Sequence, residues 1–360
     1  MIPDGQGVRM VSTNRRWIIK DYPDGLPTAS DFELVEGTIP VLADREVRLE
    51  LIHLSIDPGQ RFYIERSVRG VPIGGTMAGW AVGRVVESRS PHFPVGSFAR
   101  DTMGQAGMQD YAVLPDRALV PIAGEAPLSW HLGALGMPGL TAFFGMVDIG
   151  RPCAGEVVLI SGTSGSVGSV AAQIARIQGC RTIGIARGAE KALYLRQRLG
   201  LDGVIDTQVE DLVLTLERDC PGGMDLFFDN VGGDVLDAAL LRMRRGGRIV
   251  TAGMMATYNQ QGELQGLRNY DQMFRRKLCW LAFSVGDHVA DYRRATEALE
   301  RWVLDGDIRF DEHIRQGIER FPAMLDTLFT RRPLGKMVLQ LRDEPSVDER
   351  RSAPQGRVPV

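Results

Sequence analysis

EVVLISGTSGSVGSVAAQIARIQG, at residues 156–179, is the stretch that decides the fold class of this chain. It opens with the short apolar run VVLI (157–160), which is typical of a strand buried on both faces of a parallel sheet. A glycine-rich turn follows, and then an apolar stripe at helical spacing that ends before Gly179, a residue suited to a helix C-terminus. The stretch therefore predicts a strand, a glycine turn and a helix in direct succession.

Gly162, Gly165 and Gly168 recur at every third position of the turn. A diphosphate reaches the backbone N–H groups at a helix N-terminus only where no side chain holds it away, and the positive end of the helix dipole adds to the attraction. The spacing is GxxGxxG instead of GxGxxG, and small residues also join strands to helices for packing reasons. The turn predicts a dinucleotide site, with simple packing as the alternative.

Strands and helices continue to alternate after this stretch, which predicts a Rossmann-type, doubly wound parallel sheet of class α/β. The further strands are expected at residues 182–186, 204–206, 225–229, 248–252 and 278–285. The helices are expected at residues 169–178, 190–199, 209–218, 235–243 and 290–304.

The first third of the chain carries short strands separated by turns, expected at residues 16–20, 32–36, 47–56 and 80–86. This pattern predicts a partly open antiparallel β-barrel. We expect the barrel domain to occupy residues 1–135, the nucleotide-binding domain 136–305, and a segment at 306–342 to return to the barrel. The ends, 1–13 and 343–360, are polar or charged and are expected to be disordered. Pro138 should break or kink a helix at 132–144 near Met137.

The composition narrows the class of protein. The chain has 360 residues, 44% of them hydrophobic, and a net charge of −3, so it has room for two domains and no general basic field for nucleic acid. It has no apolar stretch of about 20 residues and no leader-like start, which leads us to expect a cytoplasmic protein without a membrane partner. Its four cysteines are isolated and indicate neither a disulfide framework nor a zinc ribbon.

Positive charge follows the second predicted strand of the parallel sheet. An NAD-selective fold places an acid about 20 residues past the glycines, to bind the ribose hydroxyls. Here the strand ends at Arg187, and Lys191 lies one helical turn further on. The pair suits the extra phosphate of NADP(H), although two solvated surface cations are the alternative.

Several strings along the chain resemble the medium-chain dehydrogenase/reductase superfamily, in particular the zinc-independent leukotriene B4 dehydrogenase/prostaglandin reductase group and its bacterial curcumin-reductase relatives. They are NRRW (14–17), SIDP (55–58), VVES (85–88), FPVG (93–96), LGMPGLTA (135–142), GAEK (188–191), FDNVGG (228–233), TYN (257–259) and LGK (334–336). The resemblance implies a GroES-like barrel beside the nucleotide domain. It also implies a homodimer formed through the apolar segment LCWLAFSV (278–285), for which core packing is the alternative.

The turn, the cations and the resemblance together imply a set of cofactor-binding residues. The set is Met137, Thr141, Gly162, Ser164, Gly165, Val167, Gly168, Arg187, Lys191, Asn230, Gly232, Gly253, Phe283 and Val285. Arg61 and Tyr63 are expected in the substrate pocket. The chain departs from the group's pattern at Gly59, Gln60 and Pro333.

No metal site is expected. Zinc-dependent relatives supply a cysteine after an early strand and a Gly-His-Glu motif, because Zn²⁺ needs thiolate and imidazole ligands. This chain has SIDP and GGTMAGWAVG in those places, and none of its five histidines has a partner at ligand spacing.

Without a metal, a hydrogen-bond donor must stabilise the oxyanion that develops when hydride adds to a conjugated carbonyl compound. The resemblance nominates Tyr258 for this catalytic role. Alternatively, Tyr258 only packs its loop and the nicotinamide ribose hydroxyl donates instead. We therefore expect NADPH-dependent reduction of the C=C bond of enals or enones, with quinone reduction or a non-catalytic NADPH-binding redox sensor as alternatives.

Overall fold

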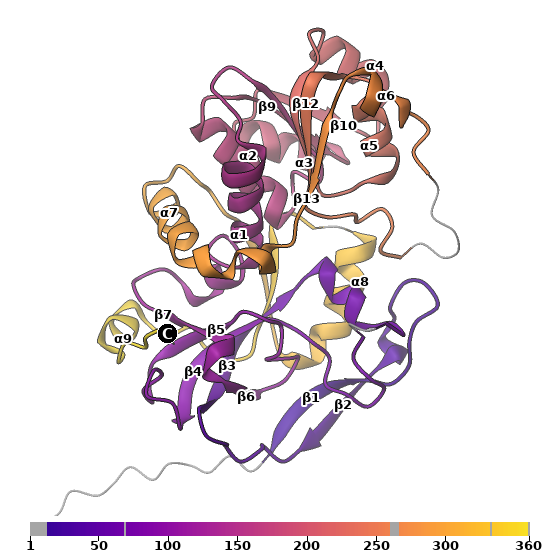
Figure 1. The fold of residues 1–360 in the computed structure, drawn as a ribbon. Helices are drawn as coiled ribbons and strands as arrows, with labels where there is room; N and C mark the ends of the chain where they lie inside the picture. Colours follow the sequence, from indigo (N-terminus) through magenta and orange to yellow (C-terminus); the bar gives the residue numbers. More distant parts are fainter. Residues whose placement is uncertain (1–12, 68–69, 260–265, 332, 359–360) are drawn as a thin grey trace, which may run out of the picture.

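Two large β-sheets organise the chain, one in each half of the molecule (Figure 1). The computed structural model describes residues 13–67, 70–259, 266–331 and 333–358. Most of the N-terminal segment that we expected to be disordered, residues 1–12, lies outside these ranges. A separate two-stranded sheet joins β1 (Asn14–Ile19) to β2 (Phe32–Gly37).

The first large sheet has six strands, all paired in parallel, in the order β10-β9-β8-β11-β12-β13. Its strands are β8 (Val157–Ile160), β9 (Arg181–Ala186), β10 (Gly203–Asp206), β11 (Met224–Asp229), β12 (Met243–Thr251) and β13 (Cys279–Ala282). The helices between and after them are α2 (Ser166–Ile177), α3 (Ala189–Leu193), α4 (Leu212–Asp219), α5 (Gly233–Leu240), α6 (Asp271–Arg275) and α7 (Tyr292–Leu304). The predicted doubly wound parallel sheet is confirmed.

The strand order reverses direction at β8. From β8 the chain moves outward through β9 to β10 on one side, and β11 to β13 then fill the other side. The loops after β8 and β11 therefore leave the sheet in opposite directions. In open parallel sheets a crevice forms at this switch point, at the carboxyl ends of the strands.

The glycine turn after β8 has the backbone that the sequence predicts. Gly162 has a φ of +59°, a left-handed conformation that a side chain disfavours. Gly179, with a φ of +79°, follows the end of α2. The face of α2 that packs against the sheet is buried, which explains the apolar stripe seen in the sequence.

The second large sheet, called the barrel sheet below, has seven strands from both ends of the chain, in the order β14-β15-β3-β4-β5-β7, with β6 also paired to β3. The part of the molecule that contains it is called the barrel half. Its strands are β3 (Glu46–Ile56), β4 (Ala81–Ser88), β5 (Phe98–Asp101), β6 (Tyr111–Pro115), β7 (Leu119–Ile122), β14 (Glu312–Gln316) and β15 (Lys336–Gln340). All pairs are antiparallel except β14 with β15. Along the chain, helix α8 (Phe321–Thr330) follows β14 and precedes β15.

Pro138 lies at the start of a helix and not inside one, which corrects our expectation of a break or kink. Helix α1 (Met137–Phe143) begins one residue before the proline. Proline is well tolerated in the first turn, because the N–H group that it lacks would have no acceptor there. The proline therefore marks the start of a helix, and the residues before it form a separate short 3-10 segment at Leu128–Leu132.

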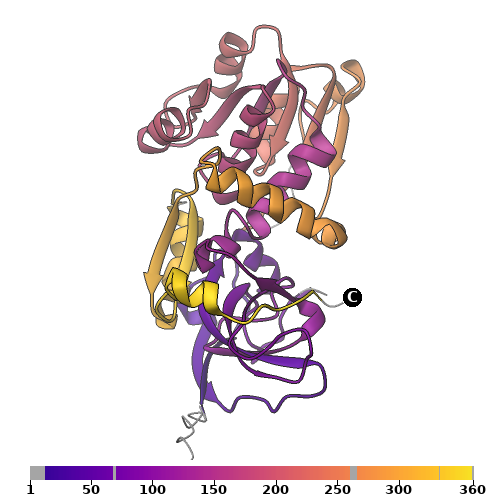
Figure 2. The same cartoon turned by 90° about the vertical axis from the view of Figure 1, so that its left-hand side faces the viewer.

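The C-terminal tail is folded over residues 343–358, so the prediction of disorder is wrong there. Helix α9 (Val347–Ser352) lies beside the barrel sheet (Figure 2). The buried guanidinium of Arg350 donates to Glu344 at 2.9 Å and to the carbonyl of Glu125 at 2.7 Å. Charged composition suggested disorder, but tertiary ion pairs of this kind are not visible in local sequence.

Among the residues within the described ranges, no helix has the length and apolar character needed to cross a membrane.

Candidate active site

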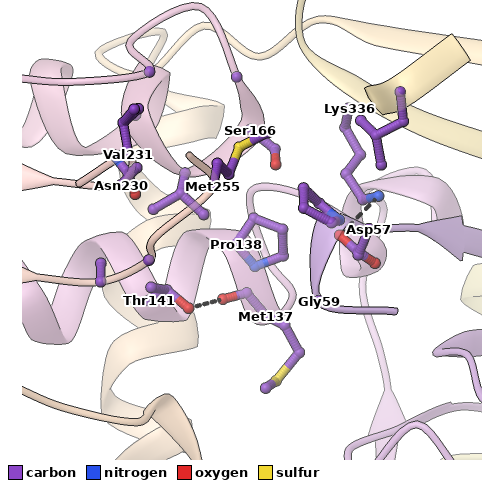
Figure 3. Close-up of a pocket in the computed structure, with 18 of the residues that line it drawn as sticks. Asp57, Gly59, Met137, Pro138, Thr141, Ser166, Asn230, Val231, Met255 and Lys336 are labelled. Atoms are coloured by element: carbon purple, nitrogen blue, oxygen red, sulfur yellow. Dashed lines mark hydrogen bonds and ion pairs between the residues drawn. The ribbon is translucent and has the colours of Figure 1, made fainter. Parts of the chain in front are cut away.

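A cavity of about 950 Å³ lies between the two large sheets, at the switch point of the parallel sheet. Its walls come from the glycine turn after β8, from the loops after β9 to β12, and from the ends of β3 and β15 in the barrel sheet. Figure 3 shows part of this wall, with Asp57 and Lys336 of the barrel half facing Pro138 and Met255 of the other half.

Most of the residues predicted for the site meet in this cavity. Those that line it are Tyr63, Met137, Thr141, Gly162, Ser164, Gly165, Val167, Gly168, Arg187, Lys191, Asn230, Gly253, Tyr258, Phe283 and Val285. Two do not line it: Gly232 and Arg61.

The glycine turn forms a bare concave corner of the cavity. A Cβ on Gly168 would lie 2.4 Å from the carbonyl oxygen of Gly162, so no side chain fits there. A Cβ on Gly165 would meet only that same oxygen, at 3.3 Å. Since α2 begins at Ser166, the N–H groups of its first turn have no intrahelical acceptor, and they lie at the cavity wall. This donor set and its bare surface fit a diphosphate.

Arg187 and Lys191 lie at the end of the cavity that β9 and β10 form. The nearby carboxylate of Asp206 is already used, because its Oδ1 accepts the N–H groups of Gly188 at 2.6 Å and Gln208 at 3.0 Å. The carboxylate of Asp206 therefore stabilises the loop and is not available to bind a ribose hydroxyl. The two cations suit an additional phosphate group.

Asn230 lies on the opposite side of the switch point, after β11. Its amide nitrogen donates to the carbonyl of Ser161 at 2.7 Å, which ties the loop after β11 to the loop after β8. The buried carboxylate of Asp229 accepts the hydroxyl of Ser161 at 2.7 Å and the N–H of Gly232 at 3.0 Å. Burial raises the pKa of Asp229 and these donors oppose that rise.

Gly232 therefore lies outside the cavity wall and stabilises the loop that carries Asn230. Its N–H is directed at Asp229, and with a φ of +71° it forms the turn into α5. The FDNVGG string led to the prediction that Gly232 binds the cofactor, but the string alone does not indicate which of its residues line the cavity.

Two pairs of predicted residues form the central wall. The hydroxyl of Thr141 donates to the carbonyl of Met137 at 2.7 Å within the first turn of α1 (Figure 3). Phe283 and Val285, just after β13, line the cavity and pack on the core of the nucleotide half. The Tyr292 hydroxyl donates to the carbonyl of Val285 at 3.2 Å.

Tyr258 lies where the loop after β12 meets the barrel half. Its ring packs edge-on against Phe62, with centroids 4.8 Å apart, and its hydroxyl oxygen accepts the N–H of Met254 at 3.5 Å. Burial raises the pKa of Tyr258 above its ordinary value. The side chain therefore remains protonated at neutral pH, and its proton is available for donation into the cavity.

Arg61 is turned away from the cavity. Its guanidinium donates to the carbonyl of Ile64 at 3.0 Å and lies 3.8 Å from Glu65. The reason is local, because the segment Pro58–Tyr63 is a 3-10 turn that directs successive side chains to different sides. Tyr63 and the unpredicted Phe62 reach the cavity from this turn. Of the departures, Gly59 and Pro333 line the cavity and Gln60 is buried.

Sequence reasoning missed three further groups in the wall: Trp80, Asp57 and Lys336. The SIDP and LGK strings contain Asp57 and Lys336, but nothing in either string indicates that the two residues pair across strands. The GGTMAGWAVG segment contains Trp80, and its pattern predicts a strand and no metal motif but does not place the indole in a cavity wall.

Within the described part of the chain, no three His, Cys, Asp or Glu side chains gather closely enough to hold a metal ion. The expectation of a metal-free site stays a prediction.

Sequence profiles of two known families match this chain. The profile described as an N-terminal domain of oxidoreductase matches residues 15–122, and the one described as a zinc-binding dehydrogenase matches residues 166–301.

Similar proteins match over nearly the whole chain. The NADPH-dependent curcumin reductase of Escherichia coli (strain K12) is 33% identical over 341 residues, covering 91% of this chain and 97% of that protein. Prostaglandin reductase 1 of Sus scrofa is 35% identical over 330 residues, covering 91% and 98%. The crystal structure of CurA from Vibrio vulnificus in complex with NADPH matches with a TM-score of 0.85 and 33% identity, covering 91% and 99%.

A doubly wound sheet that faces a mostly antiparallel sheet across one cleft is the architecture of a two-part, nucleotide-dependent oxidoreductase. The chain belongs to the medium-chain dehydrogenase/reductase family.

Proposed function

We propose that this protein is an NADPH-dependent reductase of the C=C bond of α,β-unsaturated aldehydes and ketones. One observation carries the proposal: the glycine corner, the two cations and Tyr258 all line one continuous cavity. The relatives named for curcumin and prostaglandin reduction, and the NADPH-bound neighbour, support the same activity and cofactor.

The residues of the cavity fit the parts of NADPH in order. The corner at Gly162, Gly165 and Gly168 and the N-terminus of α2 would hold the diphosphate. Arg187 and Lys191 would hold the additional phosphate by charge-assisted hydrogen bonds. Six other predicted wall residues would border the nicotinamide half, namely Met137, Thr141, Asn230, Gly253, Phe283 and Val285.

When bound, NADPH supplies a hydride from nicotinamide C4. Addition of that hydride to the β-carbon of an enone moves negative charge onto the substrate's carbonyl oxygen, and the α-carbon then takes a proton. Tyr258 has a protonated hydroxyl at the cavity wall, so we assign it the hydrogen bond to that oxygen. The aromatic rings of Phe62, Tyr63 and Trp80 give the barrel side of the cavity an apolar surface suited to the substrate's carbon skeleton.

The test is NADPH consumption with a trans-2-enal, a curcumin-like enone and a small quinone, each repeated with NADH. We expect turnover of the enal and the enone, with NADPH strongly preferred. Turnover of the quinone alone would assign the protein to quinone reduction. Binding of NADPH without turnover of any acceptor would leave the redox-sensor alternative.

We also propose a homodimer joined at β13. Among the residues that the structure describes, this strand pairs only with β12, so it forms an edge of the six-stranded sheet, and Trp280 on it is 40% exposed. Phe274, in α6 just before it, is 89% exposed, so an apolar surface adjoins the open edge. Light scattering should give twice the chain mass, and Trp280→Arg should give a monomer. A monomeric unmodified protein would refute the dimer. The cytoplasmic location stays a prediction.

A further inference from the structure

A small internal cavity of about 10 Å³ lies behind the wall of the large one. The two cavities share Trp80 and Met137 as lining residues, so these two residues lie in the wall between them. The other residues around the small cavity are Ser55, Arg100, Asp101, His131 and Leu132.

Three polar groups around this cavity have a buried atom with no hydrogen-bond partner among the residues that the structure describes. They are the indole nitrogen of Trp80, one terminal guanidinium nitrogen of Arg100 and Nε2 of His131. Each comes from a different part of the chain: the residue before β4, strand β5 and the 3-10 segment Leu128–Leu132. Leaving one buried polar group unpaired costs about 1–3 kcal/mol, so three around one cavity call for a shared partner.

Arg100 is the one charged group among these three, and it is buried. It is 2% exposed, and none of the ion pairs in the described part of the chain includes it. The neighbouring Asp101 directs its two oxygens at the backbone N–H groups of Met103 and Ala106, at 2.9 and 3.1 Å. The guanidinium otherwise faces the ring of Tyr292, 5.9 Å from its centroid.

We propose that this cavity binds one water molecule, which accepts hydrogen bonds from Trp80 and Arg100 and donates one to His131. A volume of about 10 Å³ is at the lower limit for one water, and three hydrogen bonds is the usual number for a buried one. Burial, with help from Arg100 and Arg350, lowers the pKa of His131 to about 3. Its ring is thus neutral and one of its nitrogens is an acceptor. An anion fits less well, because the Asp101 carboxylate lines the same cavity.

The water has a consequence for the large cavity. It fixes the indole of Trp80, which packs edge-on against Tyr63 with centroids 6.2 Å apart, and both rings line the substrate side. Trp80, Arg100 and His131 would therefore act as positioning residues, through the water, on the aromatic wall that the substrate meets.

The direct test is a crystal structure of the unmodified protein with NADP⁺, at a resolution that shows ordered water. We expect one peak within hydrogen-bond distance of the Trp80 indole nitrogen, the Arg100 guanidinium and His131 Nε2. An empty cavity would refute the site. An anomalous peak there after a bromide soak would also overturn the proposal, since it would identify an anion site.

A kinetic test addresses the positioning role and rests on the proposed reductase function, whereas the density does not. In His131→Leu we expect the peak to vanish and the KM for the enone to rise several-fold, with kcat and the KM for NADPH unchanged. His131→Gln, which keeps a side-chain acceptor, should restore both. Loss of the peak without a change in KM would contradict the positioning role. If His131→Leu does not fold, loss of the peak in Trp80→Phe takes its place, and a peak retained there would refute the role of the indole.

Discussion

The ammonium nitrogen of Lys336 lies 3.1 Å from Oδ1 of Asp57, although the two residues belong to opposite ends of the chain. Lys336 is 1% exposed and also donates to the carbonyl groups of Ile56 and Met337, at 2.7 and 2.9 Å. Burial lowers the pKa of Lys336, and Asp57 opposes that effect. The pair joins the end of β3 to the start of β15 at the wall of the large cavity.

Lys336→Met should lower the free energy of unfolding by about 3 kcal/mol, because it removes one partner of a largely buried ion pair and leaves two carbonyl groups without a donor. Asp57→Asn should also destabilise, since it leaves a buried ammonium without its counter-charge. The double variant should lose less than the sum of the two, by more than about 1 kcal/mol in a urea-denaturation cycle. Strict additivity would show that the pair is not coupled.

The matched control for this cycle is the exposed pair Arg293–Glu297, whose side chains are 86% and 65% exposed and 3.8 Å apart. Arg293→Ala should change the free energy of unfolding by less than about 0.5 kcal/mol.

Gly165→Ala and Gly168→Ala should separate cofactor binding from folding. The Cβ at 165 meets only one atom, at 3.3 Å, so this variant should fold but bind NADP⁺ at least tenfold more weakly, because a methyl group occupies the diphosphate corner. At 168 the Cβ would lie 2.4 Å from backbone, so that variant should also lose stability. Isothermal calorimetry with thermal unfolding measures both. Gly59→Ala, with open space around its Cβ, should change neither. Unchanged affinity in Gly165→Ala would contradict the placement of the diphosphate.

Arg187→Ala and Lys191→Ala should each raise the KM for NADPH roughly tenfold, since a hydrogen bond to a charged group contributes about 1.5–3 kcal/mol. The KM for NADH should stay the same, because NADH lacks the additional phosphate. Steady-state kinetics with both cofactors supplies its own control. An equal change for both cofactors would mean that these side chains do not read the phosphate.

Tyr258→Phe should lower kcat by about a hundredfold while the affinity for NADP⁺ is unchanged, because only the donor to the developing oxyanion is removed. Burial raises the pKa of Tyr258 above its ordinary value of 10, so its hydroxyl is protonated at neutral pH. The part of the rate that depends on Tyr258 should therefore not change with pH in the neutral range. Turnover of Tyr258→Phe at the unmodified rate would assign the donor role to the nicotinamide ribose.

The free energy of unfolding should depend on pH through His131. The pKa of His131 is about 3 in the folded state and 6.5 in the unfolded state. On acidification, the unfolded chain therefore binds a proton at His131 before the folded chain does. The contribution of His131 to the free energy of unfolding is therefore complete above pH 6.5. It falls toward pH 3 by about 1.4 kcal/mol per pH unit. Urea denaturation between these limits should show a slope smaller by this amount in His131→Leu. Identical slopes would show that His131 is not a neutral buried group.

The elements that the sequence predicts best are those whose local pattern agrees with their tertiary role. Strand β8 has its predicted bounds, Val157–Ile160, because a short apolar run between a turn and a glycine corner has few other ways to be buried. The predictions for Pro138 and for the C-terminal tail were wrong for different reasons. The same proline is compatible with a helix start or a helix break, and the tail is held by partners such as Glu125 that lie far away in sequence.

The candidate site divides in the same way. Residues that share one short motif, such as those of the glycine turn, could be predicted from sequence because their spacing alone sets their relative positions. Asp57 with Lys336, and Trp80 with Arg100 and His131, come from distant parts of the sequence and meet only in the folded chain, so no single stretch of sequence predicts either group. Arg61 was assigned from its motif, but the 3-10 turn directs its side chain to Ile64 instead of the cavity.

The most direct test of the central claim is to follow the transferred hydrogen. The protein would be incubated with a trans-2-enal and NADPH that carries deuterium at the transferring face of nicotinamide C4, and the product would be analysed by mass spectrometry and NMR. We predict a saturated aldehyde with one deuterium on the β-carbon. Deuterium on the carbonyl carbon of an allylic alcohol, or no product at all, would contradict the account.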